Sequence, residues 1–331
     1  MLAPGPLVGA QGGTIDRTLW VFGGEDKTGA KQRAVWSVSF DDMRWIQHPD
    51  MPSDRVGGQA VYDGKNAFLV YGGCAGADVA AGTCAPFERF DVVTQTWTPL
   101  AAGPGQRLQA GLAMEDDTLW LYAGVDPVTG ELYRDTWSYL GGWTSYGPSP
   151  VFGAPVGPTI AAGTGPISTM SGGFWFTWVA GVAQSTANFG QTTVPTCMWE
   201  SDTNVYVWLG NAAGDVYVCS TTNGICVQDD SMARASVAGV LCGAVDATLW
   251  SYGGGDEPPA GDTGDVPARP DSGFVDSGPS DTGLRDTSTL GGSPPSFDTS
   301  TLDSANNDLW RYHDRTWKQM MNGAADLSGG G

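Results

Sequence analysis

Charged residues are scarce in this sequence, and positively charged ones are the scarcest. Only 16% of the 331 residues are charged, and 16 Lys and Arg stand against 36 Asp and Glu, for a formal net charge of −20. Nucleic-acid phosphates and anionic lipid surfaces both attract Lys and Arg, which this chain has in small number. We therefore expect no nucleic-acid partner and no binding to an anionic membrane, and we interpret the acidity mainly as a source of solubility.

Long hydrophobic runs are absent as well. No stretch repeats apolar residues at i, i+3, i+4 and i+7 over several turns, so long amphipathic helices are not expected. The densest apolar run, residues 174–182, is too short to cross a bilayer, which predicts no membrane insertion. Residues 1–13 have neither a basic start nor an apolar core, so no signal peptide is visible.

Glycine, proline and tryptophan are abundant, with 49, 21 and 14 residues respectively. Residues 52–100 show how they are used: four short β-type runs (58–62, 67–71, 87–91 and 96–97) are separated by turn signals. This pattern predicts a small four-stranded antiparallel sheet. The pair Gly72-Gly73 closes the second run, where we expect a tight bend or a close approach to another backbone.

The same unit recurs along the chain. Its closing pair of small residues appears at intervals of 49, 51, 39, 47 and 44 residues, as Gly23-Gly24, Gly72-Gly73, Ala123-Gly124, Ala162-Gly163, Leu209-Gly210 and Gly253-Gly254. The fourth unit fits least well. For it we expect shortened inner strands at 151–155 and 159–162 and an outer pair at 167–170 and 174–178.

A hydrophobic run ending in Gly-Gly, an aromatic residue in the third strand and a Trp in the fourth resemble the kelch repeat. The phrase at 307–312 with Trp317 is among the closest, and the whole is similar to galactose-oxidase-like kelch domains. The resemblance implies an all-β fold, a six-bladed β-propeller of four-stranded antiparallel blades. Small sheets cannot bury both faces alone, so they must stack on their neighbours through their aromatic side chains.

The propeller is expected to span residues 1–320 as a monomeric module, followed by a flexible tail at 321–331. Residues 256–306 form a low-complexity acidic segment with few apolar side chains, for which disorder is the expectation. This insert splits the sixth blade between its second and third strands.

Six cysteines suggest three disulfides. Cys74 and Cys84 share one loop, and Cys219 precedes Cys226 by seven residues, as Phe90 precedes Trp97. The second pair should therefore lie opposite one another on neighbouring strands. Cys197 and Cys242, in the first strands of adjacent blades, are a third candidate pair. Paired cysteines favour an extracellular or cell-surface location; six free, buried thiols in an intracellular protein are the alternative.

The resemblance to galactose oxidase raises the question of an enzyme. That family's copper site needs two His, two Tyr and a cross-linked Cys, whereas His48 and His313 are the only histidines here and occupy different positions in their repeats. We place His48 in a link between blades and His313 at a turn. Without an Asp box, a Ser-His-Asp group or a zinc motif, the sequence predicts no catalytic, metal or cofactor site.

The loops remain as candidate binding elements. Arg55, Arg107 and Arg234 recur before first strands, where they either line one mouth of the channel or bond to carbonyls of neighbouring blades. With Asp126 they are the candidate binding residues, on a face built from the loops that join second to third strands and the links between blades. We expect a non-enzymatic module that binds protein or glycan, within a larger secreted or surface protein. The alternatives are a carbohydrate-active enzyme resembling galactose oxidase or a sialidase, and an intracellular kelch adaptor.

Overall fold

The structure is a computed structural model. It describes residues 4–74, 84–148, 160–161, 167–171, 174–179, 182–188, 195–201, 204–209, 216–223, 225–229, 237–238, 240–245, 248–256, 309–313 and 316–321. These residues form strands and turns, with no helix among them and hence none that could span a membrane. The all-β prediction is confirmed.

The strands form four-stranded antiparallel sheets, which we number first to sixth in chain order. The first contains β2 (Gln11–Ile15), β3 (Thr18–Phe22), β5 (Val35–Ser39) and β6 (Trp45–His48), and the second β7 (Gln59–Tyr62), β8 (Ala67–Tyr71), β9 (Glu88–Asp91) and β10 (Thr96–Pro99). The third contains β11 (Gly111–Glu115), β12 (Thr118–Tyr122), β13 (Asp135–Tyr139) and β14 (Trp143–Pro148), and the fourth β15 (Ile160–Ala161), β16 (Ile167–Ser171), β17 (Phe174–Val179) and β18 (Val182–Asn188). The fifth contains β19 (Pro195–Ser201), β20 (Asn204–Leu209), β21 (Val216–Ser220) and β22 (Cys226–Asp229), and the sixth β24 (Leu241–Val245), β25 (Thr248–Tyr252), β27 (Leu309–His313) and β28 (Thr316–Met321).

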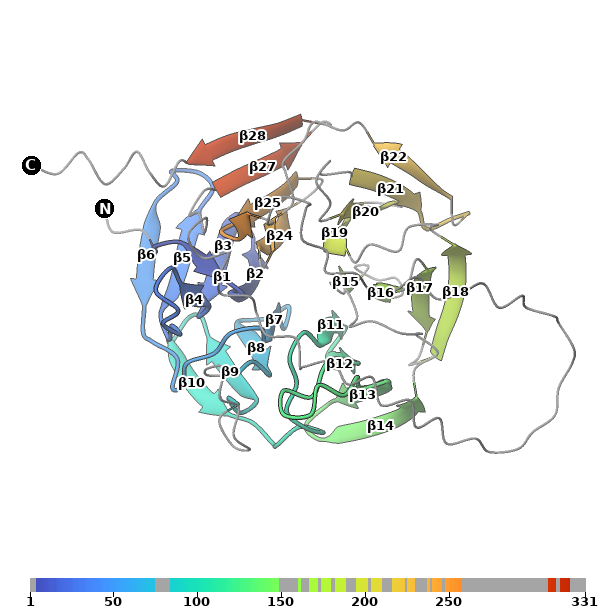
Figure 1. Ribbon diagram of the computed structural model, residues 1–331, viewed down its shortest axis with the longest axis horizontal. Coiled ribbons are helices and arrows are strands. Elements are labelled where there is room, and N and C mark those ends of the chain that lie inside the picture. The colour runs from blue at the N-terminus through green and yellow to red at the C-terminus, as the bar shows by residue number, and fades with distance from the viewer. Residues whose placement is uncertain are drawn as a thin grey trace, which may run out of the picture.

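The sheets are arranged as in a propeller. Figure 1 shows the first strand of each sheet near the centre and the fourth strand at the periphery. Each sheet is antiparallel throughout, as expected for strands joined by short turns. The strands of the second sheet lie within two residues of the predicted runs, because the alternation of apolar runs and turn residues marks their ends.

The fourth sheet corrects the prediction made for that unit. Its second strand is β16 and its third β17, so the residues expected to form the outer pair are interior to the sheet. The outermost strand is β18, which lies after the residues expected to form the outer pair. Ala162-Gly163 precedes β16 and so does not close the second strand of this sheet; the segment 151–155 lies outside the described residues.

The small-residue pairs lie where two sheets meet. A Cβ on Gly72 would stand 2.4 Å from the carbonyl oxygen of Arg107, and the φ of Gly72 is +70°. The backbone N–H of Gly73 donates to that same carbonyl at 3.0 Å, and Gly24 does so to Arg55 at 3.0 Å. The predicted close approach of backbones is confirmed at these two pairs, and it joins the first sheet to the second and the second to the third.

Aromatic side chains of the second and third strands pack between sheets, as predicted. Phe22 of the first sheet meets Phe68 of the second at 5.0 Å between ring centroids. Phe87 of the second sheet meets Tyr139 of the third at 5.0 Å. Rings of this size bury large apolar areas, so these contacts supply much of the core.

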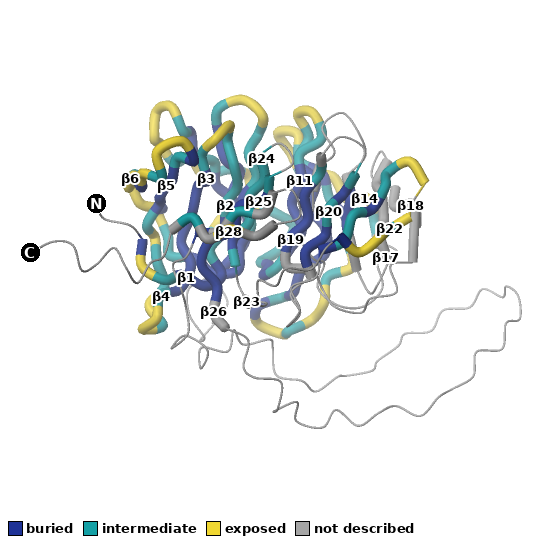
Figure 2. Tube along the Cα trace, turned by 90° about the horizontal axis from the view of Figure 1, so that it is seen from above, coloured by how far each residue is buried: buried dark blue, intermediate teal, exposed yellow. Residues whose placement is uncertain are grey.

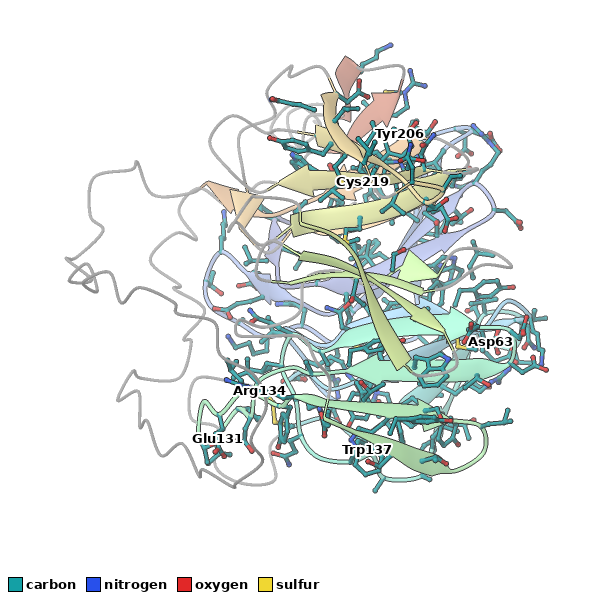
Figure 3. The ribbon with its side chains drawn as sticks, turned by 90° about the vertical axis from the view of Figure 1, so that its right-hand side faces the viewer. Asp63, Glu131, Arg134, Trp137, Tyr206 and Cys219 are labelled. Carbon is teal, nitrogen blue, oxygen red and sulfur yellow. A yellow bond between two sulfur atoms is a disulfide. The ribbon has the colours of Figure 1, made fainter. Side chains whose placement is uncertain are left out.

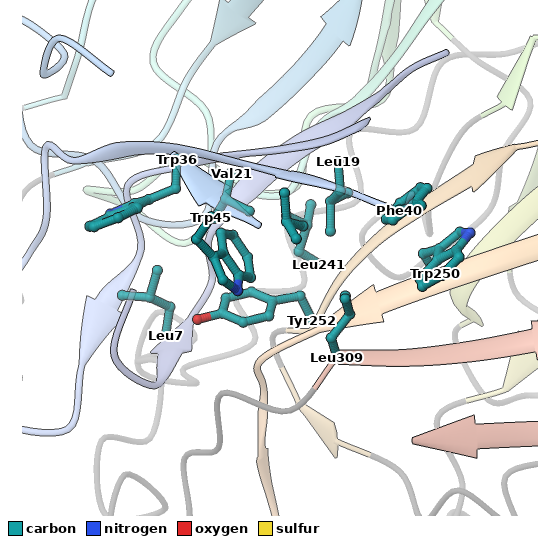
Figure 4. Close-up of a cluster of buried hydrophobic side chains, with 11 residues drawn as sticks. Leu7, Leu19, Val21, Trp36, Phe40, Trp45, Leu241, Trp250, Tyr252 and Leu309 are labelled. Atoms are coloured by element: carbon teal, nitrogen blue, oxygen red, sulfur yellow. The ribbon is translucent and has the colours of Figure 1, made fainter. Parts of the chain in front are cut away.

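The N-terminal segment joins the first sheet to the sixth. The N–H of Gly254 donates to the carbonyl of Leu7 at 3.0 Å, and the hydroxyl of Tyr252 donates to the carbonyls of Pro4 and Gly5 at 3.1 and 3.0 Å. Around these bonds Phe40 stacks on the Trp250 ring at 3.7 Å, and Trp45 contacts Tyr252 (Figure 4). Strand β2 pairs with β3 over all five of its residues, so the first sheet has a full first strand.

Loops of several sheets gather on one side of the molecule. In four sheets, the residue that follows the small pair forms a backbone β-bridge with the segment that leads into the first strand of the same sheet. These bridges join Glu25 to Val8, Cys74 to Val56, Val125 to Leu108 and Gly255 to Ala238. Two of these bridges belong to the short ladders β1 (Leu7–Val8) with β4 (Glu25–Asp26) and β23 (Val237–Ala238) with β26 (Gly255–Asp256), which lie on the lower side in Figure 2. We call this side, which carries Glu25, Cys74, Val125 and Gly255, the loop face. Glu131 lies on this side in Figure 3, whereas Asp63 lies on the opposite side.

All three predicted disulfides are present: Cys74–Cys84, Cys197–Cys242 and Cys219–Cys226. Cys219 and Cys226 are directly opposite in the register of β21 and β22. Phe90 and Trp97 occupy the same relation in the second sheet, so the disulfide replaces an aromatic contact as the spacing predicted.

The sixth sheet continues across the acidic insert. Strand β25 pairs with β27, with Tyr252 opposite Leu309, so the sheet is split between its second and third strands as predicted. The insert after Asp256 and the expected tail, beyond Met321, lie outside the described residues.

Candidate functional site

The two described arginines of the expected binding face are buried. Arg55 is 0% exposed; its guanidinium donates to the carbonyls of Gly72 and Pro86, both at 3.2 Å, and forms an ion pair with Glu88. Burial lowers the pKa of Arg55 to about 10, and the charge of Glu88 offsets part of this effect. Burial also raises the pKa of Glu88, against the opposing effect of Arg55.

Arg107 has the same role in the third sheet. It is 1% exposed, its Nη1 donates to the carbonyl of Ala123 at 2.7 Å, and its Nη2 donates to Asp135 at 2.7 Å. Its guanidinium also lies 4.0 Å from the centre of the Tyr133 ring. Burial tends to raise the pKa of Asp135, but hydrogen bonds from Arg107 and Trp137 lower it overall.

These contacts correct both interpretations of the arginines. Neither side chain lines a mouth of the channel, and the bonded carbonyls belong to each arginine's own sheet. What reaches the neighbouring sheet is the arginine's backbone carbonyl, bonded to Gly24 or Gly73. Arg55 and Arg107 are therefore structural links, and Arg234 lies outside the described residues.

Asp126 shapes its own loop. Its Oδ1 accepts from the backbone N–H groups of Val128 and Thr129 at 2.8 and 2.9 Å, and its Oδ2 accepts from the Tyr133 hydroxyl at 2.9 Å. Burial acts to raise its pKa, but these hydrogen bonds lower it. The carboxylate is ionised at neutral pH and holds a turn on the loop face.

Asp26 is the matching residue of the first sheet. It follows Glu25 as Asp126 follows Val125, and its Oδ1 accepts from the backbone N–H groups of Thr28 and Ala30 at 2.8 and 3.1 Å. Its pKa is also lowered, because these bonds outweigh the effect of burial. Asp26 was not among the residues singled out from the sequence, because Lys27-Thr28-Gly29 is one residue shorter than its counterpart, residues 127–130.

The residues that close each loop differ in chemistry. Glu25 bridges Lys31 through a buried ion pair, Cys74 bridges Cys84 through a disulfide, and Val125 bridges Leu132. Each pair occupies the same position between the second and third strands of its sheet. The loops therefore begin from a fixed base whatever their composition.

His48 lies in strand β6 and not in a link between blades. Its Nε2 is 2.8 Å from the Ser37 hydroxyl, and its ring stacks on Trp20 with 4.4 Å between centroids. Burial lowers its pKa, with an opposing effect from Gln95. His313 ends strand β27, and the described residues contain no group of three or more His, Cys, Asp or Glu placed to hold a metal.

A cavity of about 280 Å³ opens on the loop face beside the first sheet. Its walls combine the N-terminal segment with residues of the first sheet and its loop: Pro4, Gly5, Leu7, Asp26, Gln32, Ala34, Trp36 and Gln47. Trp36 is 9% exposed, so only part of its ring is available there. Sequence reasoning missed this cavity, because nothing in residues 4–7 indicated that they fold back beside Trp36.

Comparisons with known proteins give information on the fold of this chain. No family model matches the chain, and no curated protein matches it. Among solved structures, it is similar to one described as "Structure of YjhT", with a TM-score of 0.61 and 12% sequence identity over 78% of this chain and 93% of that one. At this identity the likeness speaks to architecture alone. Together with the arrangement of the sheets, it shows a β-propeller fold.

Proposed function

We propose that this chain is a closed, six-bladed kelch-type propeller that acts as a non-enzymatic binding module. It recognises protein or glycan through the loop face and belongs to a larger secreted or surface protein. The six four-stranded sheets, and the bond from Gly254 to Leu7 that joins the last to the first, support the ring. The Gly-Gly and Trp positions support the kelch assignment.

The observation that carries the binding role is the fixed base under each loop. Glu25 with Lys31, Cys74 with Cys84 and Val125 with Leu132 hold loop ends together, while the segments between them differ in length and composition. Variable loops on a rigid frame are where binding residues concentrate. The cavity beside Trp36 opens on the same face.

The disulfides support a location outside the reducing interior of the cell. All six cysteines are paired, including Cys197 with Cys242 across two sheets. Disulfides persist in oxidising compartments. The net charge of −20 favours a partner of basic or polar character.

Screening the whole chain against a displayed peptide library and a glycan array tests the proposal. The matched variant replaces loop residues 127–130 with Gly and Ser, and a control replaces Lys65-Asn66 on the opposite side. We expect a ligand that binds the parent chain and the control, and binds the loop variant less tightly. Copper-dependent oxidation or hydrolysis of a glycan, or the lack of any ligand in both screens, would overturn the proposal.

A further inference from the structure

The cavity beside Trp36 offers a ligand many more hydrogen-bond acceptors than donors. Gln32 uses its amide nitrogen on Asp26 Oδ2 at 2.7 Å and on the Ala30 carbonyl at 3.1 Å. Both partners are acceptors, so the nitrogen must face them, and both of its hydrogens are used. What Gln32 has left for a ligand is its amide oxygen.

The other polar walls have the same character. The carbonyls of Pro4 and Gly5 share one hydroxyl hydrogen, from Tyr252, and each carbonyl oxygen has two lone pairs. Asp26 is a carboxylate whose pKa is lowered, so it accepts and does not donate. Of the lining side chains, the exposed amide of Gln47 and the indole N–H of Trp36 are the donors that no bond described above uses.

Charge and shape add to this preference. The lining includes one carboxylate and no Lys or Arg. Of the nearby cations, Lys31 is paired with Glu25, and Arg33 lies within 4.0 Å of Asp50 and Asp54. Lys27, next to Asp26 in the chain, is exposed and is not among the lining residues. Trp36, Leu7 and Ala34 supply an apolar wall, and a Trp ring attracts a cation placed near its face. A ligand that suits these walls is rich in donors, positively charged and partly flat or apolar.

We propose that this cavity receives a basic side chain, Arg or Lys, of a partner protein. The proposal rests on the binding role inferred above and names the chemistry of one contact. Guanidinium and ammonium groups donate without accepting, which matches walls that mostly accept. A sugar fits less well, because each hydroxyl also brings an acceptor and the lining has few donors for it.

A pair of peptides tests this with the whole chain. Acetyl-Gly-Arg-Gly-amide carries the charge, and the same peptide with citrulline keeps the shape without it; binding is followed by calorimetry and by NMR of the indole N–H groups. We expect the Arg peptide to bind tighter than the citrulline peptide by roughly tenfold, with added salt reducing the difference.

Asp26→Asn is the test variant and Asp126→Asn its matched control, because both carboxylates hold equivalent turns while only Asp26 lines the cavity. We expect Asp26→Asn to weaken the Arg peptide roughly three- to fivefold and Asp126→Asn to leave it unchanged. Gln47→Ala, on an exposed side chain, gives a second variant that leaves the turn intact. The Gln47 amide also carries an oxygen that can accept from the guanidinium, and losing that acceptor should weaken binding of the Arg peptide by a smaller factor.

Equal binding of the two peptides, equal effects of the two Asn variants, or saturable binding of methyl β-galactoside that Asp26→Asn abolishes would each overturn the inference. A library ligand whose affinity is the same for the parent and Asp26→Asn would also overturn it, while leaving the binding role of the loop face in place.

Discussion

The backbone N–H of Gly254 donates to the carbonyl of Leu7 at 3.0 Å, across almost the whole described chain. The same bond joins Gly73 to Arg107 and Gly24 to Arg55. Leu7 therefore occupies in the first sheet the position that arginine occupies in the next two. The junction between the last sheet and the first is built like the junctions between sequence neighbours.

Tyr252→Phe tests this junction. The Tyr252 hydroxyl bonds to the carbonyls of Pro4 and Gly5, as Tyr71 bonds to the carbonyl of Gly105 at 2.6 Å. We expect Tyr252→Phe and Tyr71→Phe each to lower the free energy of unfolding by about 1 kcal/mol. Tyr62→Phe, whose hydroxyl bonds to Lys65 in an exposed turn, should cost less. Urea unfolding measures all three, and no loss in Tyr252→Phe would mean that the N-terminal segment does not hold the junction.

Removing one partner of the buried ion pair should be costly. Arg55→Met leaves the carboxylate of Glu88 buried without its cation, which lowers the free energy of unfolding by about 3–5 kcal/mol. Arg55→Met with Glu88→Met should recover much of that loss, because neither charge is then left alone. Arg17→Met breaks an exposed pair with Asp41 and should cost under about 1 kcal/mol. Equal costs for the two single variants would contradict the structural role of Arg55.

The pH dependence of the Arg55→Met variant follows from Glu88. Burial already raises the pKa of Glu88, and removing Arg55 removes the interaction that lowers it. A carboxyl whose folded pKa is raised contributes stability that is present below its unfolded pKa and is lost as pH rises through the folded pKa. The loss in free energy of unfolding caused by Arg55→Met should therefore be smaller near pH 4 than at pH 7. Thermal unfolding at both pH values measures it, and a deficit independent of pH would contradict this account.

For His48 we predict that the stability of the parent protein depends on pH with the opposite sign. Burial lowers its pKa, so the unfolded chain binds the proton more readily than the folded one. Stability from this group is complete above the unfolded pKa and falls as pH drops toward the folded pKa. His48→Gln should reduce the change in unfolding temperature between pH 7.5 and pH 5. An unchanged difference would mean that burial does not disfavour the charged His48 ring.

The disulfides should differ in how much each contributes to the free energy of unfolding. Cys197 and Cys242 are 45 residues apart and Cys219 and Cys226 are 7 apart, and a longer closed loop restricts the unfolded chain more. In the chain-entropy model, replacing the first pair with Ala should cost about 1.6 kcal/mol more than replacing the second. Guanidinium unfolding of the two double variants measures the difference. Equal costs would argue against the entropic account.

Much of the fold could be predicted from the sequence, because each recurring residue of the repeat has a single physical reason to be at its position. Gly72-Gly73 is where a backbone must pass close by, and the seven-residue spacing of Cys219 and Cys226 matched that of Phe90 and Trp97. The prediction was wrong where two patterns looked alike. In the fourth unit, Ala162-Gly163 resembled a marker, while the described strands place it ahead of β16.

The site was harder to predict than the fold. An arginine before several first strands is typical of a ligand-binding ring as well as of a buried link, and only the contacts of Arg55 and Arg107 separate the two. The cavity beside Trp36 depends on where residues 4–7 fold back, which no local pattern specifies.

Backbone bridges close the loops of the first three sheets at the same position; an ion pair accompanies the first bridge, a disulfide the second, and the third joins Val125 to Leu132. Residue pairs of different chemistry can therefore occupy this bridge position without changing the sheets. The loop beyond each bridge can therefore change in length and sequence without repacking of the core beneath it. If the loops bind as proposed, one scaffold of this design would gain new partners through changes in its loops alone, while the sheets beneath stay the same.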